Sequence, residues 1–564
     1  MKSCHYEIRF LPWEKTVTCP EGQNFMEAAL YAGIQIDAPC GGEGTCGKCR
    51  IQFVSGAPDP TGPDRTVFSD RELEKGWRLA CCALPAADAV VEVPESSLLS
   101  SHLQIMSGSE RPGRTEFSRD FPNGILAAGE KNTGIAIDVG TTTLAGELFD
   151  LDTGRILAVD VLANPQICRG DDVISRIKMA DSRKGGQKQL HEDIVGGIDK
   201  LVSMLLSAAG EKAGSLRAVT FAGNTTMQHL LCNLDISGLA RIPFQPCTLE
   251  PFSATAGSLG LKNSVNAEAW VMPVIGGFVG GDTVAGIIST SLDGDGQPRM
   301  MLDIGTNGEI VLSCNREIHA ASTAAGPALE GARISCGMRA AGGAIERVKT
   351  TDENGGDIEF EVIGGEQPRG ICGSGLIDIL AVLLDTGIVD STGRMLEANE
   401  VHGLSPGMAS RISRNSLVDL EFVLAGDSES KISFTSRDVR EMQLAIGAIR
   451  AGAGILQARA GIGLAEIKQF LIAGGFGGFI RRENALRVGL IPEGIPADIV
   501  EYVGNVSLHG AGLVLFSETE RKKAMDAANR TEHVDLSADP SFQAAFSEAM
   551  IFPVFSPRPD SGPT

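Results

Sequence analysis

Four cysteines near the N-terminus have a spacing that suits metal–sulfur chemistry. Cys40, Cys46 and Cys49 lie in the glycine-rich run Ala-Pro-Cys-Gly-Gly-Glu-Gly-Thr-Cys-Gly-Lys-Cys, and Cys81 follows in Arg-Leu-Ala-Cys-Cys. Three thiolates on one loop and a fourth from a distant turn are typical of an iron–sulfur cluster, whose sulfurs accept hydrogen bonds from the loop backbone. A structural zinc site usually takes two close cysteine pairs, and only one such pair exists here. The run therefore predicts an iron–sulfur cluster, with zinc and unligated thiols as the alternatives.

Two later turns carry residue types that bind phosphate. Asp138–Thr143 has the sequence Asp-Val-Gly-Thr-Thr-Thr, and Asp303–Asn307 has the sequence Asp-Ile-Gly-Thr-Asn. Glycine lets the backbone approach a phosphate, and the N–H groups and hydroxyls donate to its oxygens. The aspartate can orient a hydrated Mg²⁺. One such turn is common by chance, but two copies can hold phosphates from both sides of a cleft.

Three further glycine turns could line the same cleft. Ala473–Gly477 follows an expected strand and would let backbone lie against an adenosine. Asn224 also follows an expected strand, and its side chain suits either a helix cap or a ligand. Ser374 opens an expected helix and has the same two interpretations. In the loop 324–332, Glu330 could serve packing or water orientation.

The elements that must position these residues fall into several segments. Residues 1–95 have short alternating strands and one short helix, and 96–131 form a linker rich in Ser, Gly and Pro. Strands ending in glycine turns then alternate with long helices, which predicts an α/β fold with a first half over 132–295 and a second over 296–520. Residues 521–564 are expected as a C-terminal extension. The repeated turns predict that the two halves are similar and face each other.

Composition excludes several classes of protein. Of the 564 residues, 49 are Lys or Arg and 71 are Asp or Glu, so the net charge is −22. That balance argues against binding nucleic acid or an anionic membrane surface. No apolar run approaches the ~18 residues of a membrane helix, and the charged first ten residues are unlike a signal peptide. We therefore expect a cytoplasmic protein in which the other nine of the 13 cysteines are mostly buried apolar side chains.

Residues 1–95 resemble the 2Fe–2S ferredoxins, which implies a β-grasp fold and a 2Fe–2S cluster. The plant-type spacing has four residues between the first two cysteines, where this chain has five, as other branches of that superfamily do. The resemblance implies Cys40, Cys46, Cys49 and Cys81 as the metal ligands. Cys82 is expected to point away from the cluster.

Residues 133–517 resemble the superfamily of acetate and sugar kinases, heat-shock chaperones and actin. The matching motifs are two phosphate loops, the connecting helices over 280–286 and 504–512, and an adenosine motif over 473–478. The resemblance implies two ribonuclease-H-like halves around an ATP cleft; the alternative is a duplicated domain that has lost nucleotide binding. The implied catalytic residues are Asp138 and Asp303. The implied residues for ATP and Mg²⁺ are Gly140, Thr141, Thr142, Thr143, Asn224, Asp282, Gly305, Thr306, Asn307, Gly474, Gly475, Phe476 and Gly477.

An electron carrier fused to an ATPase resembles the reductive activators of corrinoid-dependent methyltransferases over nearly the whole chain. That resemblance implies an ATP-dependent enzyme that passes one electron from its cluster to the Co(II) corrinoid of a partner protein, restoring Co(I). The partners would be that corrinoid protein and an unidentified low-potential electron donor. None of the eight histidines lies in the Asp-x-His-x-x-Gly motif of corrinoid-binding domains, so the partner must carry the corrinoid. The sequence leaves open whether the chain forms a homodimer.

Two other functions fit the same modules. One is an ATP-dependent activator of a radical dehydratase or aryl-CoA reductase, although such activators hold their cluster through cysteines of the ATPase domain. The other is a regulator whose redox state gates nucleotide-dependent binding of a partner. A small-molecule kinase would leave the cluster unexplained.

Overall fold

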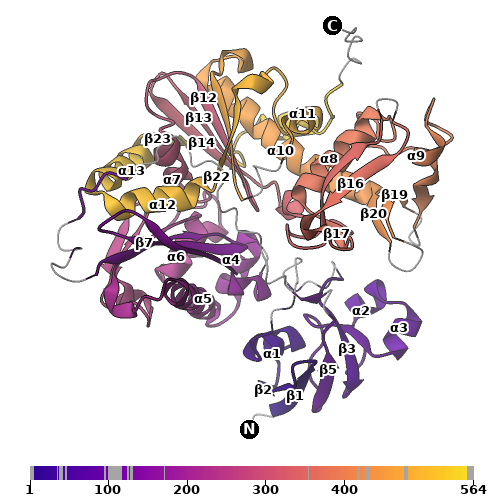
Figure 1. The fold of residues 1–564 in the computed structure, drawn as a ribbon, viewed down its shortest axis with the longest axis horizontal. Coiled ribbons are helices and arrows are strands. Elements are labelled where there is room, and N and C mark those ends of the chain that lie inside the picture. The colour runs from indigo at the N-terminus through magenta and orange to yellow at the C-terminus, as the bar shows by residue number, and fades with distance from the viewer. Residues whose placement is uncertain are drawn as a thin grey trace.

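The computed structural model describes residues 5–34, 36, 42, 44, 47–94, 97–98, 117–122, 126, 131–170, 172–352, 355–415, 419–426, 431–475 and 480–554. An N-terminal module lies below two larger α/β halves, and a smaller lobe extends from the second half (Figure 1). Most of the expected linker lies outside the described residues. None of the described helices combines the length and apolar character needed to cross a membrane.

The N-terminal module is a five-stranded sheet in the order β2-β1-β5-β3-β4. Its elements are β1 (His5–Leu11), β2 (Lys15–Pro20), α1 (Phe25–Tyr31), β3 (Arg50–Ser55), α2 (Gly62–Val67), α3 (Asp70–Glu74), β4 (Trp77–Leu79) and β5 (Ala89–Glu92). The β1–β2 hairpin is antiparallel, whereas β1 and β5 run parallel. Helix α1 begins with a capping box at Asn24 and packs Phe25 edge-to-face on Phe53 of β3. The predicted ferredoxin-like fold is confirmed.

The first α/β half is built on a six-stranded sheet in the order β10-β11-β9-β6-β7-β8. Its strands are β6 (Thr133–Val139), β7 (Thr143–Asp150), β8 (Ile156–Ala163), β9 (Leu216–Gly223), β10 (Phe252–Thr255) and β11 (Glu268–Val271). Its helices are η2 (Pro165–Cys168), α4 (Val173–Ser182), α5 (Gly186–Ala209), η3 (Ala213–Ser215), α6 (Thr225–Leu231), η4 (Ser237–Ala240), η5 (Ala256–Leu259) and α7 (Gly281–Thr290). The apolar side chains of α5 and β9 share one buried cluster.

The second half repeats this plan in the order β22-β21-β12-β13-β14-β23. Its strands are β12 (Arg299–Ile304), β13 (Gly308–Cys314), β14 (Glu317–Thr323), β21 (Gln469–Ala473), β22 (Val500–Gly504) and β23 (Thr531–His533). Its helices are η6 (Pro327–Glu330), α10 (Ser436–Ala460), η8 (Leu464–Glu466), α11 (Arg482–Arg487), η10 (Ala497–Ile499), α12 (Val506–Phe516), α13 (Glu518–Arg530) and α14 (Phe542–Ala549). Strand β23 pairs with β14, so part of the segment expected as an extension joins this sheet.

The two halves share one strand plan, which confirms the predicted duplication. Strand β6 is antiparallel to β7 and parallel to β9, as β12 is antiparallel to β13 and parallel to β21. Helices α7 and α12 pack together between the halves, and α12 contacts β6 and β9 of the first sheet. Thr220 of β9 donates its hydroxyl to Ala511 O of α12 at 2.7 Å. The cleft between the halves is therefore closed at its base by packed helices.

A lobe inserted in the second half carries two three-stranded sheets. Its elements are β15 (Ala344–Thr350), β16 (Ile358–Val362), η7 (Ile363–Gly365), β17 (Gly370–Ile371), α8 (Gly373–Asp385), α9 (Pro406–Ser410), β18 (Ile412–Arg414), β19 (Leu420–Ala425) and β20 (Ile432–Thr435). Its apolar residues continue into the core cluster of the second half. The lobe is thus packed against that half.

Candidate active site and cluster site

The two predicted phosphate loops lie against each other across the cleft. Thr142 Oγ1 lies 3.3 Å from Thr306 Oγ1, although the two residues belong to different halves. Each loop is closed by its own backbone: Gly140 N donates to Thr143 O at 2.9 Å, and Gly305 N donates to Asn307 O at 3.0 Å. A Cβ atom at Gly140 would lie 2.7 Å from Thr143 O, so this tight turn needs glycine.

Asp138, at the end of β6, is oriented by the other half. Asn505 Nδ2 donates to its Oδ2 and Ser507 Oγ donates to its Oδ1, both at 2.8 Å. Asn505 also caps α12, because its Oδ1 accepts from Leu508 N at 2.8 Å. The second connecting helix therefore fixes the aspartate of the first phosphate loop.

Four carboxyl groups interact electrostatically in the cleft: Asp138, Asp282, Asp303 and Glu309. Desolvation raises the pKa of Asp303 to about 8, and the charges of Asp282 and Asp138 add to it. Desolvation and then Asp138 raise the pKa of Asp282 to about 7, against the hydrogen bond from Thr283 N. The pKa of Glu309 is raised in the same way, by desolvation first and then by Asp282 and Asp303. Such a cluster favours a bound cation.

The first phosphate loop is braced from behind by buried polar side chains. Asn224 caps α6 through Met227 N at 3.0 Å, while its Nδ2 donates to Thr141 Oγ1 at 2.8 Å. Arg176, fully buried on α4, donates to Thr141 O at 2.5 Å. Asn164 Nδ2 donates to Gly140 O at 2.8 Å. Asn224 is thus a helix cap that also holds a loop residue, and Arg176 and Asn164 were missed because buried arginine and asparagine have no motif.

The expected adenosine turn begins where the second sheet ends. Gly474 has φ +110° and lies so close to β12 that a Cβ atom would be 2.3 Å from Ile304 O. Its N–H donates to Gly504 O at 3.1 Å. Gly475 follows in the turn, whereas Phe476 and Gly477 lie outside the described residues. The described part of the motif therefore lies beside the second phosphate loop.

Two of the four predicted cluster ligands are described, and they lie together. The sulfurs of Cys49 and Cys81 are 3.2 Å apart, and both side chains are buried. Gly44 has φ +75°, and a Cβ atom there would lie 2.5 Å from Cys82 Sγ. This pair of thiols beside a left-handed glycine loop fits an iron–sulfur cluster. Cys40 and Cys46 lie outside the described residues.

Cys82 does not point away as expected. Residues 79–83 form a turn, with Cys82 N donating to Leu79 O at 3.0 Å, so neighbouring side chains do not alternate as on a strand. Cys82 Sγ consequently lies 3.5 Å from Cys81 Sγ. The extended geometry assumed from the sequence is wrong at this position.

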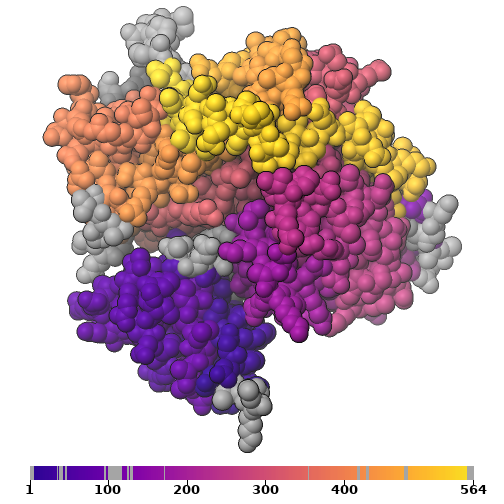
Figure 2. All heavy atoms as spheres, turned by 180° about the vertical axis from the view of Figure 1, so that it is seen from behind, coloured from indigo at the N-terminus to yellow at the C-terminus, as the bar shows by residue number. Residues whose placement is uncertain are grey.

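The N-terminal module contacts both halves of the body; seen from behind, it lies against the first half (Figure 2). Arg169, directly after η2, pairs with Glu27 of α1 and with Asp193 of α5, and the arginine side chain is 4% exposed. Lys48, within the cysteine loop, donates to Ser335 O at 3.3 Å and Gly337 O at 3.1 Å. The cluster loop therefore touches a loop of the second half.

The loop 331–339 also reaches the nucleotide cleft. A pocket is lined by Lys48 of the module, Thr142 of the first phosphate loop, and Glu330 and Arg339 of the second half. Among the residues that the structure describes, no three His, Cys, Asp or Glu side chains are placed to hold a metal ion by themselves.

Family models match three successive parts of the chain. Residues 10–86 match a 2Fe–2S iron–sulfur cluster binding domain, and 133–295 match the RACo middle region. Residues 297–559 match the C-terminal domain of RACo, the ASKHA domain. The chain thus carries an iron–sulfur domain and a domain of the nucleotide-binding ASKHA class.

Whole-chain relatives agree with these matches. The corrinoid activation enzyme RamQ of Eubacterium limosum is 30% identical over 92% of this chain and 94% of its own length. The [Co(II) methylated amine-specific corrinoid protein] reductase of Methanosarcina barkeri is 26% identical over 72% of this chain and 75% of its own. A solved structure titled reductive activator for corrinoid, iron–sulfur protein superimposes with a TM-score of 0.70 at 30% identity, covering 97% of this chain and 98% of that one.

Proposed function

The chain belongs to the RACo family of corrinoid-activating reductases, and on that premise we propose that it transfers one electron to the Co(II) corrinoid of a partner protein, restoring Co(I) with the help of ATP. The partner's corrinoid is the substrate, and an unidentified low-potential donor would reload the protein. When bound, the 2Fe–2S cluster supplies the single electron. Cys40, Cys46, Cys49 and Cys81 are the proposed ligands, supported by the buried sulfur pair Cys49–Cys81.

The observation that carries the proposal is the contact between the cluster loop and the wall of the ATP cleft. Lys48 lies between two cluster ligands in sequence and bonds the loop 331–339, which lines a pocket with Thr142 of the first phosphate loop. An isolated electron carrier would have no use for a cleft that binds ATP. A direct contact between the two parts gives nucleotide binding a route to the electron carrier.

A need for ATP follows from the energetics of the electron. Plant-type 2Fe–2S centres have potentials near about −400 mV, and the Co(II)/Co(I) couple of a bound corrinoid is commonly lower. Each ~59 mV of shortfall costs a factor of ten in the equilibrium for one electron. Turnover of ATP can offset that shortfall by changing the geometry or lifetime of the complex with the partner.

The cleft residues have distinct proposed roles toward Mg-ATP. The loops Gly140–Thr143 and Gly305–Asn307 would hold phosphates through N–H groups and hydroxyls, and Asp138, Asp282 and Asp303 would orient Mg²⁺ and its water. Asn505 and Ser507 keep Asp138 in place, and Asn224 keeps Thr141 in place. Gly474–Gly477 would face the adenosine. The four clustered carboxyl groups support a cation there, because desolvation raises their pKa values and the charges of neighbouring carboxylates add to the effect at Asp282, Asp303 and Glu309.

Asp303→Asn tests this proposal. It should lower ATP hydrolysis and ATP-stimulated Co(I) formation by about 100-fold or more, since it removes a preorganised charge from the site of phosphoryl transfer. The visible and EPR spectra of the cluster should be unchanged. Asp295→Asn, at an exposed turn before β12, is the matched control. Unchanged stimulation in Asp303→Asn would refute the proposal.

The other two functions predict different results from the unmodified protein. An activator of a dehydratase or aryl-CoA reductase would reduce that enzyme and no corrinoid protein. A redox-gated regulator would bind a partner in a nucleotide-dependent way without net electron transfer. Turnover on small added substrates would indicate a kinase.

A further inference from the structure

Glu330 is a carboxyl group in the cleft that the phosphate motifs do not include. Its Oε2 lies 3.4 Å from Thr142 Oγ1, and a Cβ atom built on Gly305 would lie 3.9 Å from its Oε1. It therefore lies beside both phosphate loops, close to their point of contact. Both carboxylate oxygens of Asp138 already accept hydrogen bonds, from Asn505 and Ser507 at the start of α12, whereas Glu330 contacts the first loop at Thr142.

Arg339 lines the same pocket as Glu330, and one of its guanidinium nitrogens is an unused hydrogen-bond donor. Its Nη1 is buried and has no hydrogen-bond partner among the described residues. Its charge lowers the pKa of Glu330, while desolvation, the larger effect, raises it. A buried guanidinium N–H without a partner is costly unless an anion arrives to accept it. A phosphoryl group held between the two loops would be such an anion.

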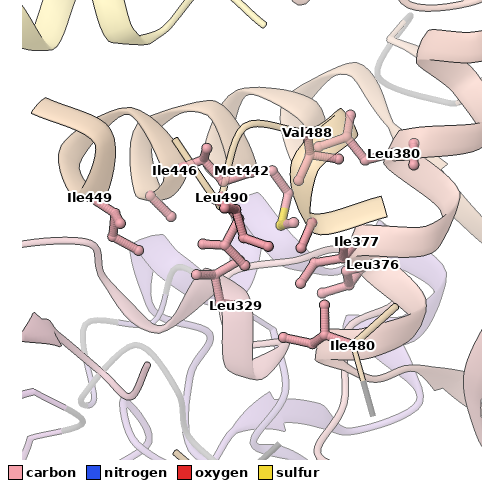
Figure 3. Packing of buried hydrophobic residues seen from close by; sticks show 14 of the residues in the cluster. Leu329, Leu376, Ile377, Leu380, Met442, Ile446, Ile449, Ile480, Val488 and Leu490 are labelled. Atoms are coloured by element: carbon pink, nitrogen blue, oxygen red, sulfur yellow. The ribbon is translucent and has the colours of Figure 1, made fainter. Parts of the chain in front are cut away.

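The segment that carries Glu330 is held rigidly. Leu329, the preceding residue, points into the core, where Met442 and Ile446 of α10 and Leu376 of α8 surround it (Figure 3). Gly331 has φ +83°, and a Cβ atom there would lie 2.5 Å from Met338 O. A Cβ atom at Gly337 would likewise lie 2.0 Å from Gly331 O. The loop is thus folded on itself at two close backbone approaches, which fixes Glu330 and Arg339 relative to each other.

We propose that Glu330 positions and deprotonates the water that attacks ATP, and that Arg339 binds the phosphoryl group as it is transferred. This inference rests on the proposed function, because it requires ATP in the cleft. The water oxygen forms a bond to the γ-phosphorus while the bond from that phosphorus to the β,γ-bridging oxygen breaks. The proton of the water passes to Glu330, and ADP and inorganic phosphate leave.

If Glu330 is the general base, replacing it should lower the rate of ATP hydrolysis by a defined factor. General base catalysis contributes about 10²–10⁴-fold to a rate, and a carboxyl group with a raised pKa is a stronger base near neutral pH. Glu330→Gln keeps the size of the side chain and removes the base. It should lower kcat for ATP hydrolysis by about 100-fold or more, while the affinity for ATP stays within about threefold.

The experiment measures ATP binding by equilibrium titration and ATP hydrolysis from pH 5.5 to 8.5, using the full chain with its cluster. Glu330→Gln should be slower than the wild type at every pH in this range, whereas the pH dependence that comes from Asp282 and Asp303, whose pKa values are also raised, should remain in both proteins. Arg339→Lys should lose rate with little loss of affinity, and Glu330→Asp should recover part of the rate. Glu359→Gln, an exposed carboxyl of β16, is the control and should behave as the wild type.

Two results would overturn the assignment. One is a kcat for Glu330→Gln within threefold of the wild type, and the other is a loss of ATP affinity at unchanged kcat. If Glu330→Gln fails to fold, the reduced rate at unchanged ATP affinity in Glu330→Asp and in Arg339→Lys tests the assignment, and a wild-type rate in both would overturn it. A wild-type protein that binds no ATP or hydrolyses none would contradict the proposed function itself, before Glu330 is at issue.

Discussion

Thr142 Oγ1 and Thr306 Oγ1 lie 3.3 Å apart, and each belongs to the phosphate loop of a different half. Both loops follow equivalent strands of the duplicated sheets, β6 and β12, so the contact joins equivalent loops, although Thr142 aligns in sequence with Asn307 and not with Thr306. A phosphate chain that reaches both hydroxyls must enter between the halves. Nucleotide binding is therefore expected to set how closely the two halves approach.

Thr142→Val tests this contact. The substitution keeps the shape of the side chain and removes the hydroxyl that faces Thr306 and Glu330. A hydrogen bond to a charged phosphate oxygen contributes about 1.5–3 kcal/mol, so the Kd for ATP should rise about tenfold or more. Equilibrium binding of ATP measures this. Thr153→Val, in the turn after β7, is the control, and equal affinities would contradict a role for Thr142 in holding phosphate.

Substitutions can distinguish the proposed cluster ligands Cys49 and Cys81 from the neighbouring cysteine, Cys82. Cys49→Ser and Cys81→Ser should each abolish or distort the visible and EPR signals of a 2Fe–2S cluster, because an iron would lose a thiolate ligand. Cys82→Ser should retain both signals, although its sulfur lies 3.5 Å from that of Cys81. Iron and acid-labile sulfide should likewise be lost from Cys49→Ser and Cys81→Ser and retained in Cys82→Ser. Loss of the cluster in Cys82→Ser alone would reverse the assignment of the fourth ligand.

Lys48→Met tests the contact between the cluster loop and the loop 331–339 of the second half. It removes the two hydrogen bonds to Ser335 O and Gly337 O while leaving the cysteines in place. ATP hydrolysis should stay within about twofold, whereas ATP-stimulated Co(II) reduction should fall about tenfold, the effect of losing about 1.4 kcal/mol of coupling. Lys75→Met, on the exposed end of α3, is the matched control. Equal losses of both activities would mean that Lys48 does not couple them.

Acid should destabilise the first half through His229. Desolvation lowers the pKa of this histidine, its Nδ1 lies 2.8 Å from Thr225 O, and its Nε2 has no partner in the described part of the chain. Because the folded-state pKa lies below the unfolded value of about 6.5, stability is full above pH 6.5 and falls as the pH drops below it.

Thermal unfolding measures that slope. Between pH 7.5 and 5.5 the contribution of His229 should lower the Tm by roughly 2–4 °C for a loss of about 1 kcal/mol, measured as the difference between the wild type and His229→Gln, because the raised pKa values of Asp282 and Asp303 act in the opposite direction. His229→Gln should remove this contribution and keep that of His533, whose pKa desolvation also lowers. His402→Gln, at an exposed position, should leave the slope unchanged. A steeper slope in His229→Gln would contradict the explanation.

Motifs predicted the elements of this fold well where one local signal dominates. The short alternating strands expected in residues 1–95 include the hairpin β1–β2, and the long helices expected after the linker include α5 and α10. Helix α10 also has clear end signals, a capping box at Thr435 and a left-handed glycine at Gly461. The join of β23 to the second sheet was not foreseen, because a three-residue strand carries too little pattern to be recognised.

The phosphate loops of the site could be predicted from the sequence, but the residues that hold these loops in place could not. Asp138 and Asp303 follow from a repeated motif, whereas Arg176, Asn164 and Ser507 act through single hydrogen bonds to loops far away in sequence. Such contacts depend on tertiary packing, and they leave no pattern of residue spacing in the sequence from which they could be predicted. The geometry at Cys82 was wrong for a similar reason, since a turn replaced the strand that alternation assumes.

The central claim is that ATP and the cluster act together on a corrinoid. The most direct measurement mixes the anaerobically reduced protein with a Co(II) corrinoid protein and follows the absorbance of Co(I), or of methyl-Co(III) with a methyl donor present. The account predicts that Co(I) forms with Mg-ATP, and that it fails to form without ATP or after Cys49→Ser. Co(I) formation at the same rate without ATP, or no formation with any corrinoid protein despite an intact cluster and measurable ATP hydrolysis, would contradict it.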